Sequence, residues 1–506
     1  MAEKKKYAKI IKTVFITGLA FAVNYLITLL LTPYITENVG TEAYGFVSLA
    51  KNIAQYATYA TIALNSFAVR FISVEYHKKE YEKANTYFSS TFFGDVGLAS
   101  IILAILLAGV YYVEKLFNIP EGLLKDIQLL FILVFLKFWL VTVASAFQTG
   151  AFIADKLDLT GIFKGLSYVV EAVFLLLFFR IFRHNVFVVG IGLLAGGLTV
   201  CLSDYWITKR YTPHLRIDKA DYRFSAVREL VVSGVWSSIN SMGSFLHSGL
   251  DLIICNIMLT PLEMGQLAIA QSVDLIFKSL DILVSKAFQP AFLKSYAEKN
   301  SKKLYQDFDL ACIFSGMIAN IMFAGFSALG LAYLKLWIPK QDTDFIYYLC
   351  IMTMIPSATT GIVYPIYYVY SLTVRKKIPC FFTLISGAMN VIGMYVLIKY
   401  FDLGIHAVVW TTVVLMTAVN FIAHPLYAAH CLGRKWTAFY LVILKNVLSG
   451  TVLFFLFRWM ASLYMPDTWG TLFGTALVYA AVGAVVHAIL TAPRQTLFLA
   501  KKLANR

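Results

Sequence analysis

Apolar stretches long enough to cross a membrane recur along the whole chain and limit its fold more than any other feature. A transmembrane helix needs about 20 consecutive, mostly apolar residues. Charged or turn-forming residues separate fourteen such windows: 13–35, 44–70, 86–112, 124–147, 160–182, 186–208, 230–258, 265–293, 309–336, 346–372, 379–400, 404–430, 437–462 and 470–491. We therefore predict an all-α polytopic membrane protein with about 14 transmembrane helices.

The amount and placement of charge exclude a soluble fold. Charged residues make up 14% of the chain, whereas soluble domains carry about 25%. The net charge of +15 is divided among short basic tracts between the apolar windows, so we expect anionic membrane lipids as partners and no nucleic acid. No nucleophile elbow, phosphate-binding loop or cluster of metal ligands occurs in the sequence. We predict no catalytic residues, no metal site and no enzymatic activity.

Lysine and arginine are distributed asymmetrically. With the N-terminus placed in the cytoplasm, 30 of the 43 basic residues fall in the tails, the inner connections or the inner helix ends, and 8 fall on the outer side. This bias satisfies the positive-inside rule, and an even number of spans returns the chain to its starting side. We expect both termini in the cytoplasm, and we expect the basic segment 1–12 to lead into a retained first helix.

A short internal repeat predicts two similar halves. The segment 45–50 at the start of the second window matches the segment 265–270 at the start of the eighth. We call the displacement from position 45 to position 265 the repeat offset. The basic segment after the sixth window suits a linker between two parallel repeats. We predict a six-helix bundle over 1–208, a cytoplasmic linker over 209–229, a second six-helix bundle over 230–430, and two further helices with a basic tail over 431–506.

Polar residues at helical spacing follow two neighbouring windows. The window 265–293 carries Gln271, Asp274, Lys278, Asp281 and Ser285, and the window 230–258 carries Ser233, Ser237, Asn240, Ser244, His247 and Asp251. Spacings of three and four place each set on one helix face. A charge at the bilayer centre costs roughly 2.5–3.5 kcal/mol, so these faces point at protein or water.

The first half repeats this pattern with more cations. The second window carries Lys51, Asn52, Gln55 and Arg70, and the first carries Asn24. Lys137 in the fourth window lies roughly 20 Å into the bilayer by helix rise. We predict a hydrated cavity lined by these candidates: Asn24, Lys51, Asn52, Gln55, Arg70, Lys137, Asn240 and Lys278.

Structural interpretations of the same charges stay open. Lys278 stands at salt-bridge spacing from both Asp274 and Asp281, which favours a structural ion network. Lys137 has Glu171 at a similar depth as a partner, and Arg70 lies near an inner helix end from which it can reach the head groups. Asp95 is also interpreted as structural.

The outer turn Gly40-Thr41-Glu42-Ala43-Tyr44-Gly45 and the stretch Ala63-Leu64-Asn65-Ser66 to Arg70-Phe71, together with the topology, resemble the polysaccharide-transporter branch of the multidrug/oligosaccharidyl-lipid/polysaccharide exporter superfamily. Members of this branch are flippases of lipid-linked oligosaccharides. The resemblance implies two six-helix bundles around a cationic cavity that opens alternately to each side. Lys51, Asn52 and Arg70 match the second helix of that family.

The resemblance also implies a substrate and a location. The expected substrate is a polyprenyl diphosphate-linked oligosaccharide of a capsule, O-antigen or teichoic-type pathway, carried across the bacterial cytoplasmic membrane. Polymerases and glycosyltransferases of the same pathway are expected partners. No cofactor is expected, and Asp251, Asp274 and Asp281 are candidates for coupling to H⁺ or Na⁺.

Three alternatives remain at this point. A cation or drug antiporter and a lipid II flippase have the same topology, but they usually carry an acid, or an Arg-Asp pair, in the first helix where this chain has Asn24-Tyr25. A membrane-embedded glycosyltransferase or polymerase uses large outer loops with catalytic carboxylates. The outer connections here are only a few residues long, apart from those near 113–123 and 337–345.

Overall fold

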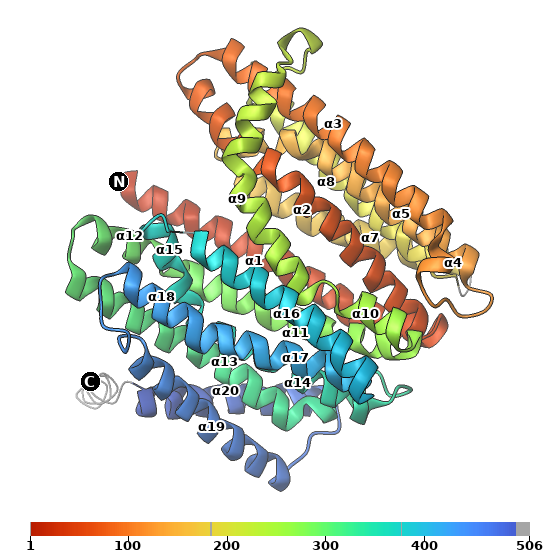
Figure 1. Ribbon diagram of the computed structural model, residues 1–506, viewed down its shortest axis with the longest axis vertical. Helices are drawn as coiled ribbons and strands as arrows, with labels where there is room; N and C mark the ends of the chain where they lie inside the picture. Colours follow the sequence, from red (N-terminus) through yellow and green to blue (C-terminus); the bar gives the residue numbers. More distant parts are fainter. Residues whose placement is uncertain (1, 183–184, 376, 492–506) are drawn as a thin grey trace. The chain divides into compact units, whose positions relative to one another are not determined.

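The computed structural model describes residues 2–182, 185–375 and 377–491, and within these ranges every regular element is helical (Figure 1). All fourteen predicted windows coincide with helices, some of them interrupted by a short 3₁₀ or π turn. Eleven helical segments of the described chain are long and apolar enough to cross a membrane. The protein is therefore a polytopic membrane protein, while the count of 14 spans stays a prediction.

The helices form two compact units. The first comprises residues 1–245 and 249–265, and the second comprises 246–248 and 266–506. The division reflects contacts between helices and not the order of the predicted spans. Most of the seventh predicted span (230–258) belongs to the first unit. The predicted bundle boundaries stay a prediction.

The first unit contains the helices drawn in red to yellow-green in Figure 1. They are α1 (Ala2–Asn38), α2 (Thr41–His77), α3 (Tyr81–Tyr111), α4 (Val113–Leu116), α5 (Leu124–Val143), η1 (Ala144–Phe147), α6 (Gln148–Ile153), α7 (Leu157–Ile181), α8 (Phe187–Tyr211), η2 (Lys219–Asp221), most of α9 (Phe224–Ser248), and α10 (Asp251–Met258). Helix α8 packs against α5 and α7, and α2 packs against α3 and α5. This arrangement puts the polar faces of α2 and α5 within one helical group.

The second unit contains nearly all of α11 and every later element. These are α11 (Pro261–Ala287), α12 (Gln289–Ala297), α13 (Ser301–Trp337), α14 (Thr343–Val363), η3 (Tyr364–Tyr367), α15 (Tyr368–Leu372), α16 (Lys377–Phe401), α17 (Ile405–Ala418), the π turn η4 (Val419–Ala423), α18 (His424–Cys431), α19 (Tyr440–Leu463) and α20 (Trp469–Thr491). The long helix α13 is central, because α12, α14, α19 and α20 all pack on it.

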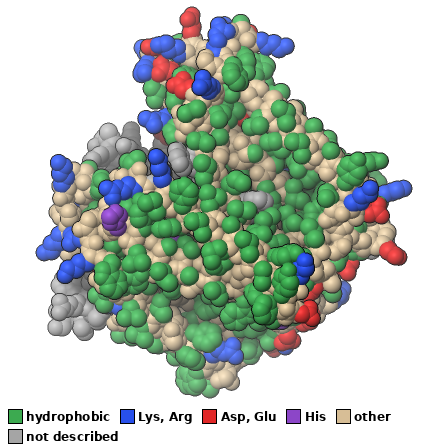
Figure 2. Space-filling model, in the orientation of Figure 1, with side chains coloured by type: hydrophobic (Ala, Val, Ile, Leu, Met, Phe, Trp, Pro, Cys, Tyr) green, Lys and Arg blue, Asp and Glu red, His purple; other side chains and the backbone are tan. Residues whose placement is uncertain are grey.

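The surface is that of a protein surrounded by lipid. Figure 2 shows apolar side chains over most of one face, with Lys and Arg gathered toward its margins. Large apolar residues on the outer helices are more than half exposed, among them Ile105 (66%), Phe455 (66%) and Leu477 (73%). A soluble monomer rarely exposes so continuous an apolar surface.

The helix boundaries confirm the internal repeat. Helix α7 (157–181) and helix α16 (377–401) have the same length and are separated by the repeat offset, as are η1 (144–147) and η3 (364–367). The turns that precede α3 and α13 also match, since Lys79 (φ 65°) and Lys299 (φ 51°) both adopt the left-handed conformation. The two halves therefore share one folding pattern, although few residues are shared between them.

The last two helices dock onto α13 through a buried polar seam. Asn320 of α13 donates to the carbonyl of Asn446 on α19 (2.8 Å), and Ser449 of α19 bonds to His487 of α20 (2.8 Å). Gly316 makes room for this seam, because a Cβ atom there would lie 1.9 Å from the Asn446 side-chain oxygen. Small residues at such crossings let membrane helices approach closely.

We predict that Gly316→Ala destabilises the second unit by about 1–3 kcal/mol, because the added methyl overpacks the crossing. Gly325→Ala on the same helix is the matched control, since nothing lies within 4 Å of a Cβ at that position. Thermal unfolding of the two detergent-solubilised proteins measures the difference. Equal melting temperatures would show that the seam does not fix the position of α19.

Candidate functional site

Lys137 lies in the interior of the first unit, on a surface made by two glycines. The residue is half-buried on α5. A Cβ atom on Gly197 of α8 would lie 2.9 Å from Lys137 Cγ, and one on Gly196 would lie 3.3 Å from Glu171 Oε2. The Gly196-Gly197 pair therefore lets the side chains of Lys137 and Glu171 pass close to the α8 backbone.

Charged and aromatic side chains from four helices interact electrostatically around Lys137. Lys137 interacts electrostatically with Glu171 of α7 and with Lys51 of α2. Tyr168 of α7 interacts with Glu171 and with Tyr25 of α1. We call these five residues the Lys51–Lys137 cluster; its two lysines outnumber its one carboxylate.

The structural interpretation of Lys137, in which it pairs with Glu171, is borne out only in part. Lys137 interacts electrostatically with Glu171, as expected, but no ion pair within 4.0 Å joins them in the described part of the chain. The side chain of Lys51 is exposed, although it lies on α2, which is a candidate membrane span. A charge in that position requires water or an ionic partner, since lipid solvates it poorly.

The other candidates of the first half are divided between this cluster and more distant positions. Asn52 and Gln55 lie within about one turn of Lys51 on α2, and Asn24 adjoins Tyr25 on α1. Arg70 is exposed but lies much further along the same helix, about 28 Å from Lys51 by helix rise. The structure therefore does not bring Arg70 into the cluster. The side chain of Asn240, a candidate from the seventh window, lies outside the described residues.

In the second unit, one predicted ion pair forms. Lys278 and Asp274 of α11 are joined at 2.8 Å, and the Asp274 side chain is almost fully buried. Asp281, further along the same helix, is 3% exposed and takes part in no ion pair within the described chain. The predicted pairing is thus confirmed for Asp274 with Lys278 and is not formed by Asp281. Whether these charges serve structure or transport stays open.

Asp251 belongs to the first unit, whereas Asp274 and Asp281 belong to the second. Asp251 is buried at the start of α10 and interacts electrostatically with Tyr56 of α2, whose hydroxyl donates to the carbonyl of Gly249. The expectation that Asp251 takes part in coupling to H⁺ or Na⁺ stays a prediction.

A buried polar network that the sequence did not reveal fixes α2 against α3. Asn65 donates to one oxygen of Asp95 (2.9 Å), and Ser145 of η1 donates to the other (2.7 Å). The structural interpretation of Asp95 is confirmed by these bonds. The second repeat has a bond at the same place, because Ser285 and Ser315, which the repeat offset relates to Asn65 and Asp95, are 3.0 Å apart.

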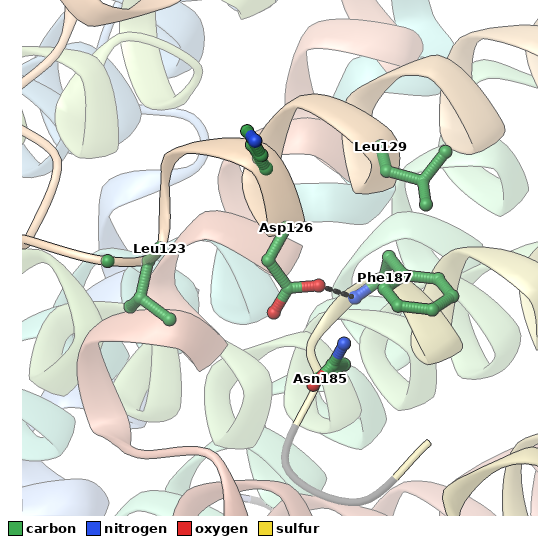
Figure 3. A pocket seen from close by; sticks show the side chains of 7 residues that line it. Leu123, Asp126, Leu129, Asn185 and Phe187 are labelled. Carbon is green, nitrogen blue, oxygen red and sulfur yellow. Dashed lines mark hydrogen bonds between the residues drawn. The ribbon is translucent and has the colours of Figure 1, made fainter. Parts of the chain in front are cut away.

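A hollow of about 400 Å³ lies at one end of the first unit, lined by Gly122, Leu123, Lys125, Asp126, Leu129, Asn185 and Phe187. Figure 3 shows the Asp126 carboxylate directed at the backbone of Phe187, from which it accepts a hydrogen bond of 3.0 Å. A second bond comes from the Val186 amide. Because these bonds cap the start of α8, we assign the hollow a structural role.

Comparison with known sequences now decides the family. Residues 10–296 match the family described as "Polysaccharide biosynthesis protein". The chain belongs to this family. A relative from Bacillus subtilis (strain 168), described as "Uncharacterized membrane protein EpsK", is 25% identical over 476 residues, which cover 94% of each chain.

Solved structures of membrane transporters have the same fold as this chain. The lipid II flippase MurJ in an inward closed conformation matches with a TM-score of 0.66 at 14% identity, over 96% of this chain and all of that one. An inward-facing multidrug resistance MATE family transporter of the MOP superfamily matches with a TM-score of 0.62 at 14% identity, over 82% of this chain and 98% of that one. The resemblance noted in the sequence is confirmed, and the fold is that of MOP-superfamily transporters.

We predict that the surface of α2 around Lys51 is hydrated. A thiol reacts as its thiolate, which forms in water and not in hydrocarbon. In a cysteine-free background, Lys51→Cys and Gln55→Cys should therefore react with a charged, water-soluble thiol reagent at least about tenfold faster than Ile105→Cys. Ile105 is 66% exposed on the apolar surface of α3. Equal rates at the three positions would contradict a hydrated cavity.

Proposed function

We propose that this protein is a flippase that moves a polyprenyl diphosphate-linked oligosaccharide from the inner to the outer leaflet of the bacterial cytoplasmic membrane by alternating access. The observation that carries the proposal is the Lys51–Lys137 cluster, which holds two ammonium groups and one carboxylate within the membrane-spanning helices of the first unit. Family membership and the transporter fold support the same function.

The cluster suits a diphosphate. Lysine ammonium groups bind phosphate oxygens through charge-assisted hydrogen bonds, which are about twice as strong as neutral ones. Lys51 is exposed and free to turn toward a ligand, whereas Lys137 is held at its stem by Gly197. One mobile and one fixed cation are able to bind a dianion and release it again.

Neighbouring side chains suit the sugar part of the substrate. Asn52 and Gln55 present amide donors and acceptors within a turn of Lys51, and Tyr25 and Tyr168 add hydroxyl groups and aromatic faces. Amide and hydroxyl groups match the hydroxyls of a glycan without adding charge. The polyprenyl tail stays in the surrounding hydrocarbon, against the apolar outer surface of the helices.

The cellular setting is part of the proposal. The basic tracts support an orientation with both termini in the cytoplasm and favour anionic lipids at that surface. The enzymes that supply and consume the substrate are glycosyltransferases that build the repeat unit and a polymerase that extends it, so these are the expected partners. The transport step itself uses no cofactor.

We predict that Lys51→Ala and Lys137→Ala each lower export of the surface polymer about tenfold or more at normal protein abundance, because each removes a charged hydrogen bond to the diphosphate. Lys137→Arg keeps the charge and should retain part of the export. Lys115→Ala is the control, since this exposed lysine lies on α4, away from the cluster. Full export from both alanine variants would leave the cluster with a structural role only.

The proposed orientation is tested separately. Single cysteines that replace Glu42, Gln341 and Asp467 should react with an impermeant reagent added to intact cells. Cysteines at Lys79, Lys302 and Arg434 should react only after the membrane is opened. The reverse pattern would place the termini outside.

A further inference from the structure

The proposed binding of the diphosphate gives no role to the buried carboxylate of Asp281. Asp281 of α11 is 3% exposed, and its Oδ1 atom accepts no hydrogen bond from the described residues. Ser357 on α14 is 2% exposed, and its hydroxyl also lacks a hydrogen-bond partner in the part of the chain that the structure describes. Buried polar atoms of this kind are rare in folded proteins, because each has lost its hydrogen bonds to water and is destabilising unless it finds a partner.

Both groups face one small cavity between α11, α13 and α14. Its other lining residues are apolar: Phe277, Ala319, Met322, Phe323, Met354 and Ala358. The centre of a water-sized sphere has about 10 Å³ available there, which is close to the space that one water molecule needs. Asp281 and Ser357 supply the polar partners that would hold such a water.

The backbone is shaped to admit the Asp281 carboxylate. A Cβ atom on Gly361 of α14 would lie 2.8 Å from both carboxylate oxygens and 2.6 Å from the Cβ of Ala319 on α13. Any residue larger than glycine at this position would push the carboxylate away. The cavity and the close approach of Gly361 are features of a built site.

Among the residues that the structure describes, the ionisable groups that interact with Asp281 bring no positive charge to balance it. Asp274 on its own helix and Tyr364 of η3 interact with it electrostatically. The nearest cation along α11, Lys278, is bound to Asp274 at 2.8 Å, and Cys350 of α14 faces Asp274. The residues that α13 contributes to the cavity are apolar. Without a counter-ion, a buried carboxylate is most easily accommodated in its neutral form.

We propose that Asp281, together with Ser357 and one water, binds and releases a proton during the transport cycle. On binding, a proton joins the carboxylate to form the neutral acid, whose O–H donates to the Ser357 oxygen or to the water; on release, the O–H bond breaks and the proton leaves through that water. A metal ion fits less well, because hard divalent cations take six to eight oxygen ligands and the two side chains supply three. The link to transport rests on the proposed flippase function.

The repeat gives this site a counterpart in the first unit. The repeat offset relates Ser357 to Lys137, and each stands at the same distance along the chain before its 3₁₀ turn, η3 or η1. It likewise relates Asp281 to Thr61, a buried hydroxyl that donates to the carbonyl of Thr58 (2.8 Å). The cation of the first half and the proton-binding acid of the second therefore stand at different positions of the repeat, and each is matched by a hydroxyl residue in the other half. This is the arrangement expected if the anion and the proton bias one conformational change from separate sites.

Infrared difference spectra of the full-length protein in liposomes, recorded while the pH is changed, test the site directly. Wild-type protein should gain a carboxylic acid band from a group shielded from bulk water as the pH falls. Asp281→Asn should lose that band, and Asp274→Asn should keep it. Ser357→Ala, which removes one hydroxyl, should move the midpoint of the band by about half to one pH unit.

The outcomes separate this proposal from the proposed function. A band that persists unchanged in Asp281→Asn, or no pH-dependent band in the wild type, would overturn the proton site whatever the substrate is. If Asp281→Asn fails to fold, an unmoved midpoint in Ser357→Ala would overturn it. Loss of export in the lysine variants together with a normal Asp281 band would uphold both proposals, whereas normal export in the lysine variants would overturn only the flippase.

Discussion

The structure depends on keeping charged side chains within helices that lipid surrounds. A charge in the bilayer costs several kcal/mol unless water or a partner solvates it, and this chain meets that demand in three different ways. Asp274 is paired with Lys278, Asp95 is bonded to Asn65 and Ser145, and Lys137 lies against the α8 backbone near Glu171 and Lys51. The first two groups have partners within the protein. The third keeps an excess of positive charge, and for that reason we assign it to substrate binding.

The repeat explains how one folding pattern supports different chemistry in its two halves. Helix positions, 3₁₀ turns and the left-handed turns at Lys79 and Lys299 recur at the repeat offset. The bond between the second and third helices of each repeat recurs as well, with Asn65 and Asp95 replaced by Ser285 and Ser315. The side chains that we assign to ligands differ instead, since the position of Lys137 is taken by Ser357 in the second half. Folding constraints are thus shared between the halves, and charge is not.

The sequence predicted the helices well because hydrophobic length is a local property. The windows, the repeat and the Asp274–Lys278 pair could all be read from composition and spacing, and the structure confirms them. Helical spacing shows which residues share a face of a helix, but it does not show which of them lie close enough to bind one ligand. Lys51 and Arg70 both lie on α2, for example, and about 28 Å of helix separates them. Contacts between helices were missed for the same reason. Nothing local in Gly196-Gly197 or in Gly361 shows that a charged side chain from another helix crosses there.

The proposed function requires the protein to move lipids with an anionic head group selectively. It is tested most directly with liposomes that contain the purified protein and either a fluorescent polyprenyl diphosphate-linked oligosaccharide or a lipid with the same tail and a cationic head group. The account predicts that the protein moves the diphosphate-linked lipid between leaflets well above the rate in protein-free liposomes and leaves the cationic lipid at that background rate. Movement of the cationic lipid alone, or equal movement of both, would contradict it.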